Sequence, residues 1–100
     1  MMKNLGEIKQ TLQSTQSNLK EKYGVIGVFL FGSYVRGEQK ADSDLDILLE
    51  LERPPRIDLF DLVELQDSLS DLLGIEVDIA LKHNLRKRIG KRILEEAIPV

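Results

Sequence analysis

Apolar residues recur along the first half of the chain with two spacings, one typical of helices and one of strands. Helical spacing predicts a first helix between Asn4, which suits an N-cap, and Gly24, which suits the position after a helix end. Residues 25–31 are almost wholly apolar and predict a short strand buried on both faces. Residues 45–51 alternate and predict a second strand. Its inward face comprises Leu45, Ile47, Leu49 and Leu51.

The second half of the chain repeats this alternation. A helix is predicted from its N-cap Asp58 to Leu73, where Gly74 stops it. Its predicted core side comprises Leu59, Leu62, Val63, Leu69 and Leu73, and its acidic outer side comprises Asp61, Glu64, Asp67 and Asp71. Residues 75–81 predict the clearest strand by alternation, and residues 84–97 predict a last helix.

The order of these elements predicts the fold class. Between the first two strands, residues 33–37 predict one helical turn and residues 38–43 a polar loop. No repeat or linker divides the chain, so we expect a single domain over residues 1–100. The expected class is α+β in two layers, with a small, mixed, three-stranded sheet covered by helices on one face and open on the other.

Composition excludes several classes of function. The 100 residues include no cysteine, which excludes disulfides, thiolate zinc sites and cysteine nucleophiles. The net charge of −3 argues against general nucleic-acid binding. The longest apolar run, residues 25–31, is far shorter than the roughly 20 residues of a membrane helix. Residues 1–10 lack the apolar region of a signal peptide, so we expect a soluble cytoplasmic protein.

Candidate chemistry gathers between the first two strands. The pair Gly32–Ser33 directly follows the first strand, and Asp44 and Asp46 occupy alternate positions where the second begins. Alternate residues of a strand share a face, so both carboxylates would project side by side next to a turn with free amides. Two hard oxygen ligands beside such a turn indicate a divalent metal carrying a polyphosphate. This pattern predicts a nucleotide site.

A third carboxylate can join this pair. If the second and third strands are neighbours, Asp78 lies beside Asp44 and Asp46 on the open face. Three such carboxylates would raise one another's pKa values unless a cation is present. The chemistry that fits best is transfer assisted by two Mg²⁺ ions about 3.5–4 Å apart.

The motifs together resemble a known family. Gly32–Ser33, Arg36–Gly37, residues 43–46 and the later Asp78 are similar to the signature of the DNA polymerase β-type nucleotidyltransferase superfamily. The length and order of elements resemble its minimal branch, and the ending, residues 92–100, resembles the tail of that branch. The resemblance implies the nucleotidyltransferase fold.

The resemblance also implies roles for individual residues. Asp44 and Asp46 would bind two Mg²⁺ ions, and Asp78 would be a third ligand that helps to deprotonate the acceptor hydroxyl. Gly32 and Ser33 would hold the terminal phosphates of the nucleotide. Arg36 would either contact the phosphates or hold the loop in place. Ser43 is the remaining candidate among the nucleotide-binding residues. The product would be a nucleoside monophosphate joined to the acceptor, with pyrophosphate released.

The acceptor is predicted to be a macromolecule, because few residues remain outside the core elements to grip a complex substrate. Relatives of this type are encoded beside a HEPN ribonuclease toxin. The resemblance implies that this chain is its antitoxin and transfers AMP from ATP to a tyrosine of the toxin. Two alternatives remain open: a non-catalytic antitoxin that occludes its partner, and a transferase acting on a small molecule. A transferase acting on a small molecule would need an acceptor pocket, which a homodimer could supply. The oligomeric state is left open between a homodimer and a hetero-oligomer.

Each candidate also has a plain structural explanation. Gly32–Ser33 could be an ordinary capped turn, Asp44 and Asp46 the solvated face of a strand, and Asp78 an exposed polar residue. Basic residues cluster near the C-terminus at Lys82, Arg86, Lys87, Arg88, Lys91 and Arg92. A solvated helix face is the better explanation of this cluster, and contact with the triphosphate or a partner is the alternative.

Overall fold

The computed structural model describes residues 4–100. Residues 1–3 lie outside this part. They belong to the expected domain and to the segment 1–10 that lacks the pattern of a signal peptide. The elements in chain order are α1 (Leu5–Tyr23), β1 (Val25–Phe31), α2 (Ser33–Arg36), β2 (Leu45–Leu51), α3 (Leu59–Leu73), β3 (Val77–Leu81), the 3₁₀ helix η1 (Lys82–Asn84), α4 (Lys87–Glu96) and β4 (Ile98–Pro99). Over residues 4–100, no helix is both long and apolar enough to cross a membrane.

The strands form one mixed sheet in the order β3-β2-β1-β4. The β2–β3 pair is parallel, whereas β1 runs antiparallel to both β2 and β4. This confirms the α+β class and the mixed sheet, but the expected count of three strands is wrong. The fourth strand pairs Ile98 with Leu30 and Pro99 with Phe29. Two residues are too few for a period to show in the sequence.

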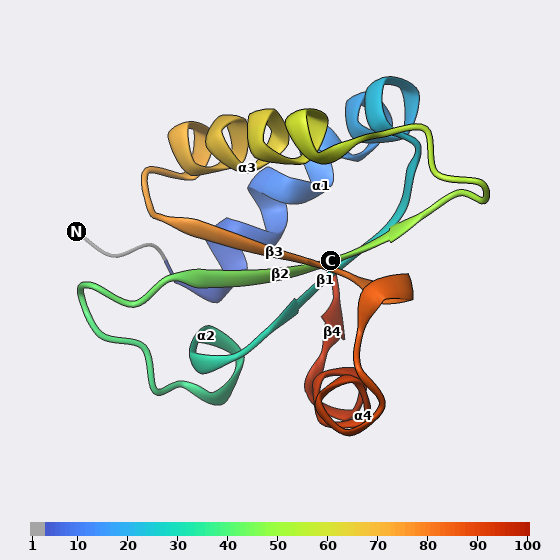
Figure 1. Ribbon diagram of the computed structural model, residues 1–100. Helices are drawn as coiled ribbons and strands as arrows, with labels where there is room; N and C mark the ends of the chain where they lie inside the picture. The colour runs from blue at the N-terminus through green and yellow to red at the C-terminus, as the bar shows by residue number, and fades with distance from the viewer. Residues whose placement is uncertain (1–3) are drawn as a thin grey trace.

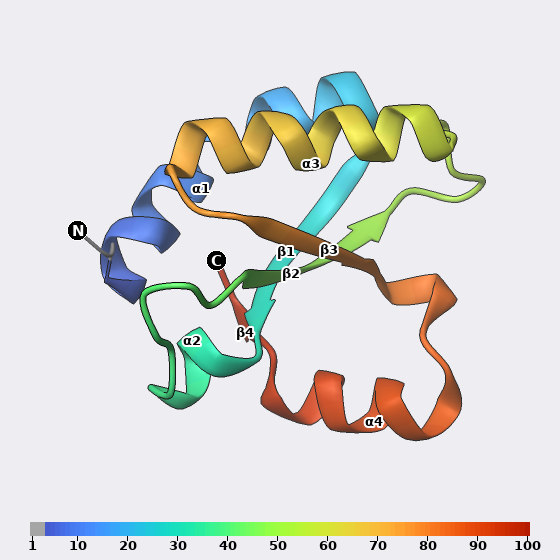
Figure 2. The same ribbon diagram turned by 60° about the vertical axis from the view of Figure 1, so that its left-hand side comes forward.

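The helices lie on both sides of the sheet. Helices α1 and α3 cover one face, as predicted, whereas α4 lies on the opposite side (Figures 1 and 2). The expectation that the other face is open therefore fails at the end occupied by α4. This helix buries only Gly90, against which Leu85 packs, and its apolar residues Ile89 and Leu94 are about half exposed, so it does not join the main core.

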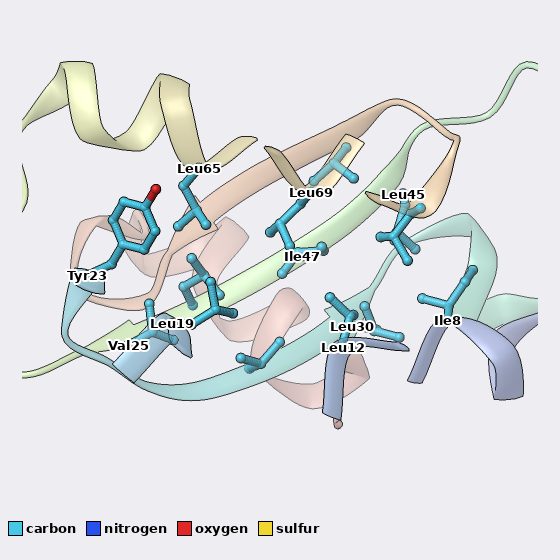
Figure 3. Close-up of a cluster of buried hydrophobic side chains, with 14 of the residues drawn as sticks. Ile8, Leu12, Leu19, Tyr23, Val25, Leu30, Leu45, Ile47, Leu65 and Leu69 are labelled. Carbon is cyan, nitrogen blue, oxygen red and sulfur yellow. The ribbon is translucent and has the colours of Figure 1, made fainter. Parts of the chain in front are cut away.

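The core fills the space between the sheet and the α1–α3 layer (Figure 3). All four predicted inward residues of β2 are buried. On α3 the buried residues are Leu65, Leu69 and Leu73, whereas the predicted core residues Leu59 and Val63 are 72% and 52% exposed. The apolar residues of α3 extend beyond the side that is buried against the core, so some of them remain in solvent.

The first strand also departs from its prediction. Val25, Val28 and Leu30 are buried, but Ile26 is 54% exposed, so β1 is not buried on both faces. An irregularity between Val25 and Gly27 in the pairing with β2 shifts the alternation at this end. An apolar run alone does not reveal such a bulge.

The predicted helix ends are largely confirmed. The Asn4 side chain accepts a hydrogen bond from the Glu7 amide, and Asp58 caps α3. Gly24 and Gly74 end α1 and α3 in the left-handed conformation that favours glycine. Two starts were predicted too early: β3 begins at 77 rather than 75, and α4 begins at 87 rather than 84 because η1 occupies 82–84.

Candidate functional site

The parallel β2–β3 pair places two of the predicted aspartates next to each other. Asp46 and Asp78 are register partners in this pair, so their side chains project from the same face. Asp44 precedes β2 by one residue and is exposed, as is Asp78, whereas Asp46 is partly buried. The expectation that β2 and β3 are neighbours is confirmed, and with it the placement of Asp78 beside Asp46.

Asp46 occupies an electrostatically unfavourable position. Its pKa is raised to about 6, mainly by burial and then by the charges of Asp78 and Asp44. The positive charge of Arg36 opposes it. A carboxylate that is partly buried and surrounded by like charges is costly to keep ionised, and a cation would relieve that cost.

The donors fit a hard cation, although they do not form a closed cage. Across residues 4–100, no three His, Cys, Asp or Glu side chains are grouped closely enough to hold one ion. Mg²⁺ usually binds one or two carboxylates and completes its shell with water and substrate phosphates. The oxygen donors and the raised pKa of Asp46 fit such an open site.

Gly32 and Asp46 fit together as one unit. The φ of Gly32 is +83° and its ψ is −156°, a conformation that residues with a side chain rarely adopt. A Cβ atom at this position would lie 2.0 Å from Oδ2 of Asp46. Only glycine therefore lets the turn lie against the carboxylate. This contact is a second reason for glycine at position 32, in addition to the predicted approach of a phosphate.

A residue that sequence reasoning missed contacts this turn. The Gly32 amide donates a hydrogen bond of 2.8 Å to Oε2 of Glu96, at the end of α4. Nη1 of Arg36 donates one of 2.7 Å to Oε1 of the same carboxylate. The Arg36 guanidinium and the Gly32 amide lower the pKa of Glu96. The resemblance of residues 92–100 to a family tail pointed to this segment but gave Glu96 no role.

These residues surround a cavity of about 290 Å³ between the sheet and α4. Its lining includes Gly32, Arg36 and Asp46 on one side and Arg92 and Glu96 on the other. Three predicted site residues therefore meet at one cavity. Of the basic cluster, Arg92 alone lines it.

Two other predicted residues have separate surroundings. Ser43 accepts a hydrogen bond of 2.8 Å from the Lys40 amide and lines a different hollow, beside Asp42 and Ser70. Ser33 is partly buried at the first position of α2. The position of Ser43 gives it a part in closing the loop.

Comparisons with known proteins agree on one family. The sequence profile described as the nucleotidyltransferase domain matches residues 12–100. The chain is 42% identical over 99 residues to the protein adenylyltransferase MntA of Thermococcus cleftensis, covering 99% of this chain and 98% of that protein. It is 35% identical, with a TM-score of 0.81, to a solved structure described as a minimal nucleotidyltransferase, covering 98% of this chain and 97% of the other.

A more distant structure shares the fold. It is the complex of a tri-AMPylated HEPN toxin with an MNT antitoxin from Shewanella oneidensis, matched at 17% identity with a TM-score of 0.68. The match covers 94% of this chain and 69% of that one. At this level of identity the similarity shows a common fold.

Proposed function

The chain belongs to the nucleotidyltransferase domain family, and we propose that it transfers AMP from ATP to a hydroxyl group of a partner protein. The observation that carries this proposal is the position of Asp46. It lies beside Asp78 on the neighbouring strand and against the Gly32 turn, with a raised pKa. Burial and like charges at a single carboxylate, in a cleft lined by arginines, are typical of sites that bind a metal–nucleotide complex.

Each residue has a role in this reaction. Asp44 and Asp46 hold Mg²⁺, and Gly32 and Ser33 present backbone amides and a hydroxyl to the phosphates. Bound Mg²⁺, in two ions, supplies electrostatic stabilisation of the attacking and leaving oxygens. Arg36 adds positive charge beside the phosphates. Ser43 acts indirectly, by holding the loop that leads into Asp44.

The transfer exchanges one bond to phosphorus for another. The acceptor oxygen bonds to the α-phosphorus while the bond from that phosphorus to the bridging oxygen breaks, and pyrophosphate leaves. The proton of the acceptor hydroxyl passes to Asp78, the carboxylate beside Asp46. A tyrosine hydroxyl suits this arrangement, because a nearby cation lowers its pKa from about 10 and a weak base then suffices.

The proposed acceptor is a tyrosine of a HEPN ribonuclease toxin, which this protein would neutralise as an antitoxin in the cytoplasm. Three observations support it: the sequence motifs, the adenylyltransferase named among the relatives, and the fold shared with an antitoxin of a HEPN toxin. The proposed unit is the single domain of residues 1–100. Its few residues outside the core leave recognition of the acceptor to docking of the partner.

Occlusion of the partner without catalysis is a second candidate. The observation that favours it is the exposed apolar surface of α3, where Phe60 is 83% exposed beside Leu59. Such residues are enriched in protein interfaces. They are equally compatible with docking of a substrate protein, so an experiment must separate catalysis from binding.

Intact-mass spectrometry of the toxin makes this separation. The protein is incubated with Mg²⁺, ATP and the cognate HEPN toxin, and the toxin should gain the mass of one or more AMP units. Asp44→Asn should abolish the gain. Asp42→Asn is the matched control, because it removes the same charge only two residues from Asp44. Asp42 lies exposed in the loop, and its side chain makes no hydrogen bond or ion pair within residues 4–100. Neutralisation that persists in Asp44→Asn without any mass gain would establish occlusion.

A further inference from the structure

Glu96 binds two of the donors that line the candidate nucleotide cavity. Its carboxylate accepts one hydrogen bond from the Gly32 amide and one from the Arg36 guanidinium. The side chain is only 25% exposed, and it lines the same cavity as Asp46. A negatively charged side chain therefore fills the part of the cleft that faces both donors.

A backbone N–H and a guanidinium are the groups with which proteins commonly bind phosphate oxygens. A phosphate oxygen and a carboxylate oxygen make the same kind of charge-assisted hydrogen bond with them. Both cannot occupy the cavity together at low energy, because Glu96 and Asp46 already repel each other there. The negative charges of a triphosphate would add to this repulsion.

We propose that Glu96 occupies a phosphate position of the cleft, and that it must leave the Gly32 amide and Arg36 when a nucleoside triphosphate binds. The inference rests on the proposed function and assigns Glu96 as the residue that sets nucleotide affinity. Release of Glu96 frees Nη1 of Arg36 for the phosphates, while Nε of Arg36 keeps its hydrogen bond of 2.9 Å to Glu38. A carboxylate of the protein is thereby replaced by a phosphate of the substrate.

The position of Glu96 in the fold permits this release. It is the last residue of α4, and the backbone is extended at Ala97 before β4 begins. α4 buries only Gly90, so movement of its end disturbs few apolar contacts. The β4 pairing of Ile98 with Leu30 is separate from the Glu96 side chain and can persist.

The opposite role for Glu96 is a permanent latch. In that case its carboxylate would hold the Gly32 turn and Arg36 in place while the phosphates bind elsewhere, and its loss would weaken nucleotide binding. The two roles predict effects of opposite sign for one substitution.

The test is the affinity for ATP with Mg²⁺, measured by calorimetry on the wild-type protein, Glu96→Gln and Glu95→Gln. Glu96→Gln keeps the shape but removes the charge, and it should bind ATP about fivefold more tightly, or about 1 kcal/mol. Glu95 is the matched control, since it is exposed on α4 and its side chain makes no hydrogen bond or ion pair within residues 4–100. Glu95→Gln loses the same charge from the adjacent position, and its affinity should equal that of the wild type.

Glu96→Asp provides a second variant if Glu96→Gln proves unfolded in a thermal melt. It keeps the charge but is one methylene too short to span both donors, and it should also bind ATP more tightly. Equal or weaker binding by the folded variants, with normal binding by the wild type, overturns the role of Glu96 alone. Failure of every variant to bind ATP overturns the proposed function and this inference with it. Binding by Glu96→Gln where the wild type binds none supports the inference.

Discussion

Asp46 and Asp78 are register partners across the parallel β2–β3 pair, one partly buried and the other exposed. The pKa of Asp46 is raised to about 6, first by burial and then, among the neighbouring charges, most by Asp78. The two carboxylates are thus chemically unequal although adjacent. Unequal acids side by side allow one to hold a cation while the other exchanges a proton.

The first prediction concerns this coupling. Asp78→Asn should lower the pKa of Asp46 toward its ordinary value, because it removes the largest neighbouring negative charge. The measurement is a carboxyl NMR titration without divalent metal. Asp71→Asn, an exposed change on α3, is the control and should leave the pKa unchanged. An unchanged pKa in Asp78→Asn would show that the two groups do not interact.

The second prediction concerns stability against pH. The folded-state pKa of Asp46 lies above its ordinary value of 3.8, so between about pH 4 and 6 the folded state binds more protons than the unfolded state. The contribution of Asp46 to stability therefore falls as the pH rises through this window. Asp46→Asn should be more stable than the wild type at neutral pH, by on the order of 1 kcal/mol after allowance for solvent screening.

Urea unfolding at pH 4 and pH 7.5 measures this effect. The gain from Asp46→Asn should be present at pH 7.5 and nearly absent at pH 4, where the wild-type carboxyl is largely protonated. A variant that is destabilised at both pH values would mean that Asp46 is a structural residue. The proposed role of Asp46 in binding metal would then lose its main support.

The third prediction uses two glycines that both have positive φ. Gly32→Ala should destabilise the protein by about 3 kcal/mol, because it combines backbone strain with a contact of 2.0 Å to Asp46. Gly37 has φ +72°, but a methyl group added there would meet no atom within 4 Å, so Gly37→Ala should cost only about 1 kcal/mol. Thermal melts of both variants measure the two costs. Gly37→Ala reports αL strain alone, whereas Gly32→Ala adds a more restricted backbone conformation, with ψ −156°, and the conflict with Asp46. Equal costs would contradict both added contributions at Gly32.

The fourth prediction concerns metal removal. ATP should bind in the presence of Mg²⁺, and binding should disappear on addition of a chelator, because carboxylates alone repel the triphosphate. Calorimetry of the wild type and Asp44→Asn tests both parts, and the variant should lose binding even with Mg²⁺. Equal binding with and without the metal would contradict the assignment of Asp44 and Asp46 as its ligands.

The parts of the fold that could be predicted depend on neighbours in the sequence. The caps at Asn4 and Asp58 act within one helical turn, and the alternation of residues 45–51 reports burial of one strand face directly. The site motif could be recognised for the same reason, since Gly32 and Asp46 lie at the two ends of the single connection between β1 and β2. Placing Asp78 beside Asp46 required only that β2 and β3 be neighbours, which they are.

What could not be predicted depends on contacts between distant residues. Glu96 reaches the Gly32 amide across 64 positions of the chain, and no periodicity encodes such a contact. The two residues of β4 form a strand only because the edge of β1 is available to them. The exposure of Ile26 follows from a pairing irregularity that the apolar run conceals.

The parallel pairing of β2 with β3 requires the chain to return along the whole length of the sheet between them, and α3 makes this return. With 15 residues, the helix spans about 22 Å, close to the length of about 23 Å of the seven-residue β2. The length of α3, which packs on the face of the sheet opposite α4, therefore sets the alignment of Asp46 with Asp78. Surface residues around the cleft can therefore change without disturbing the alignment of the two carboxylates, because α3 fixes that alignment from the other face of the sheet.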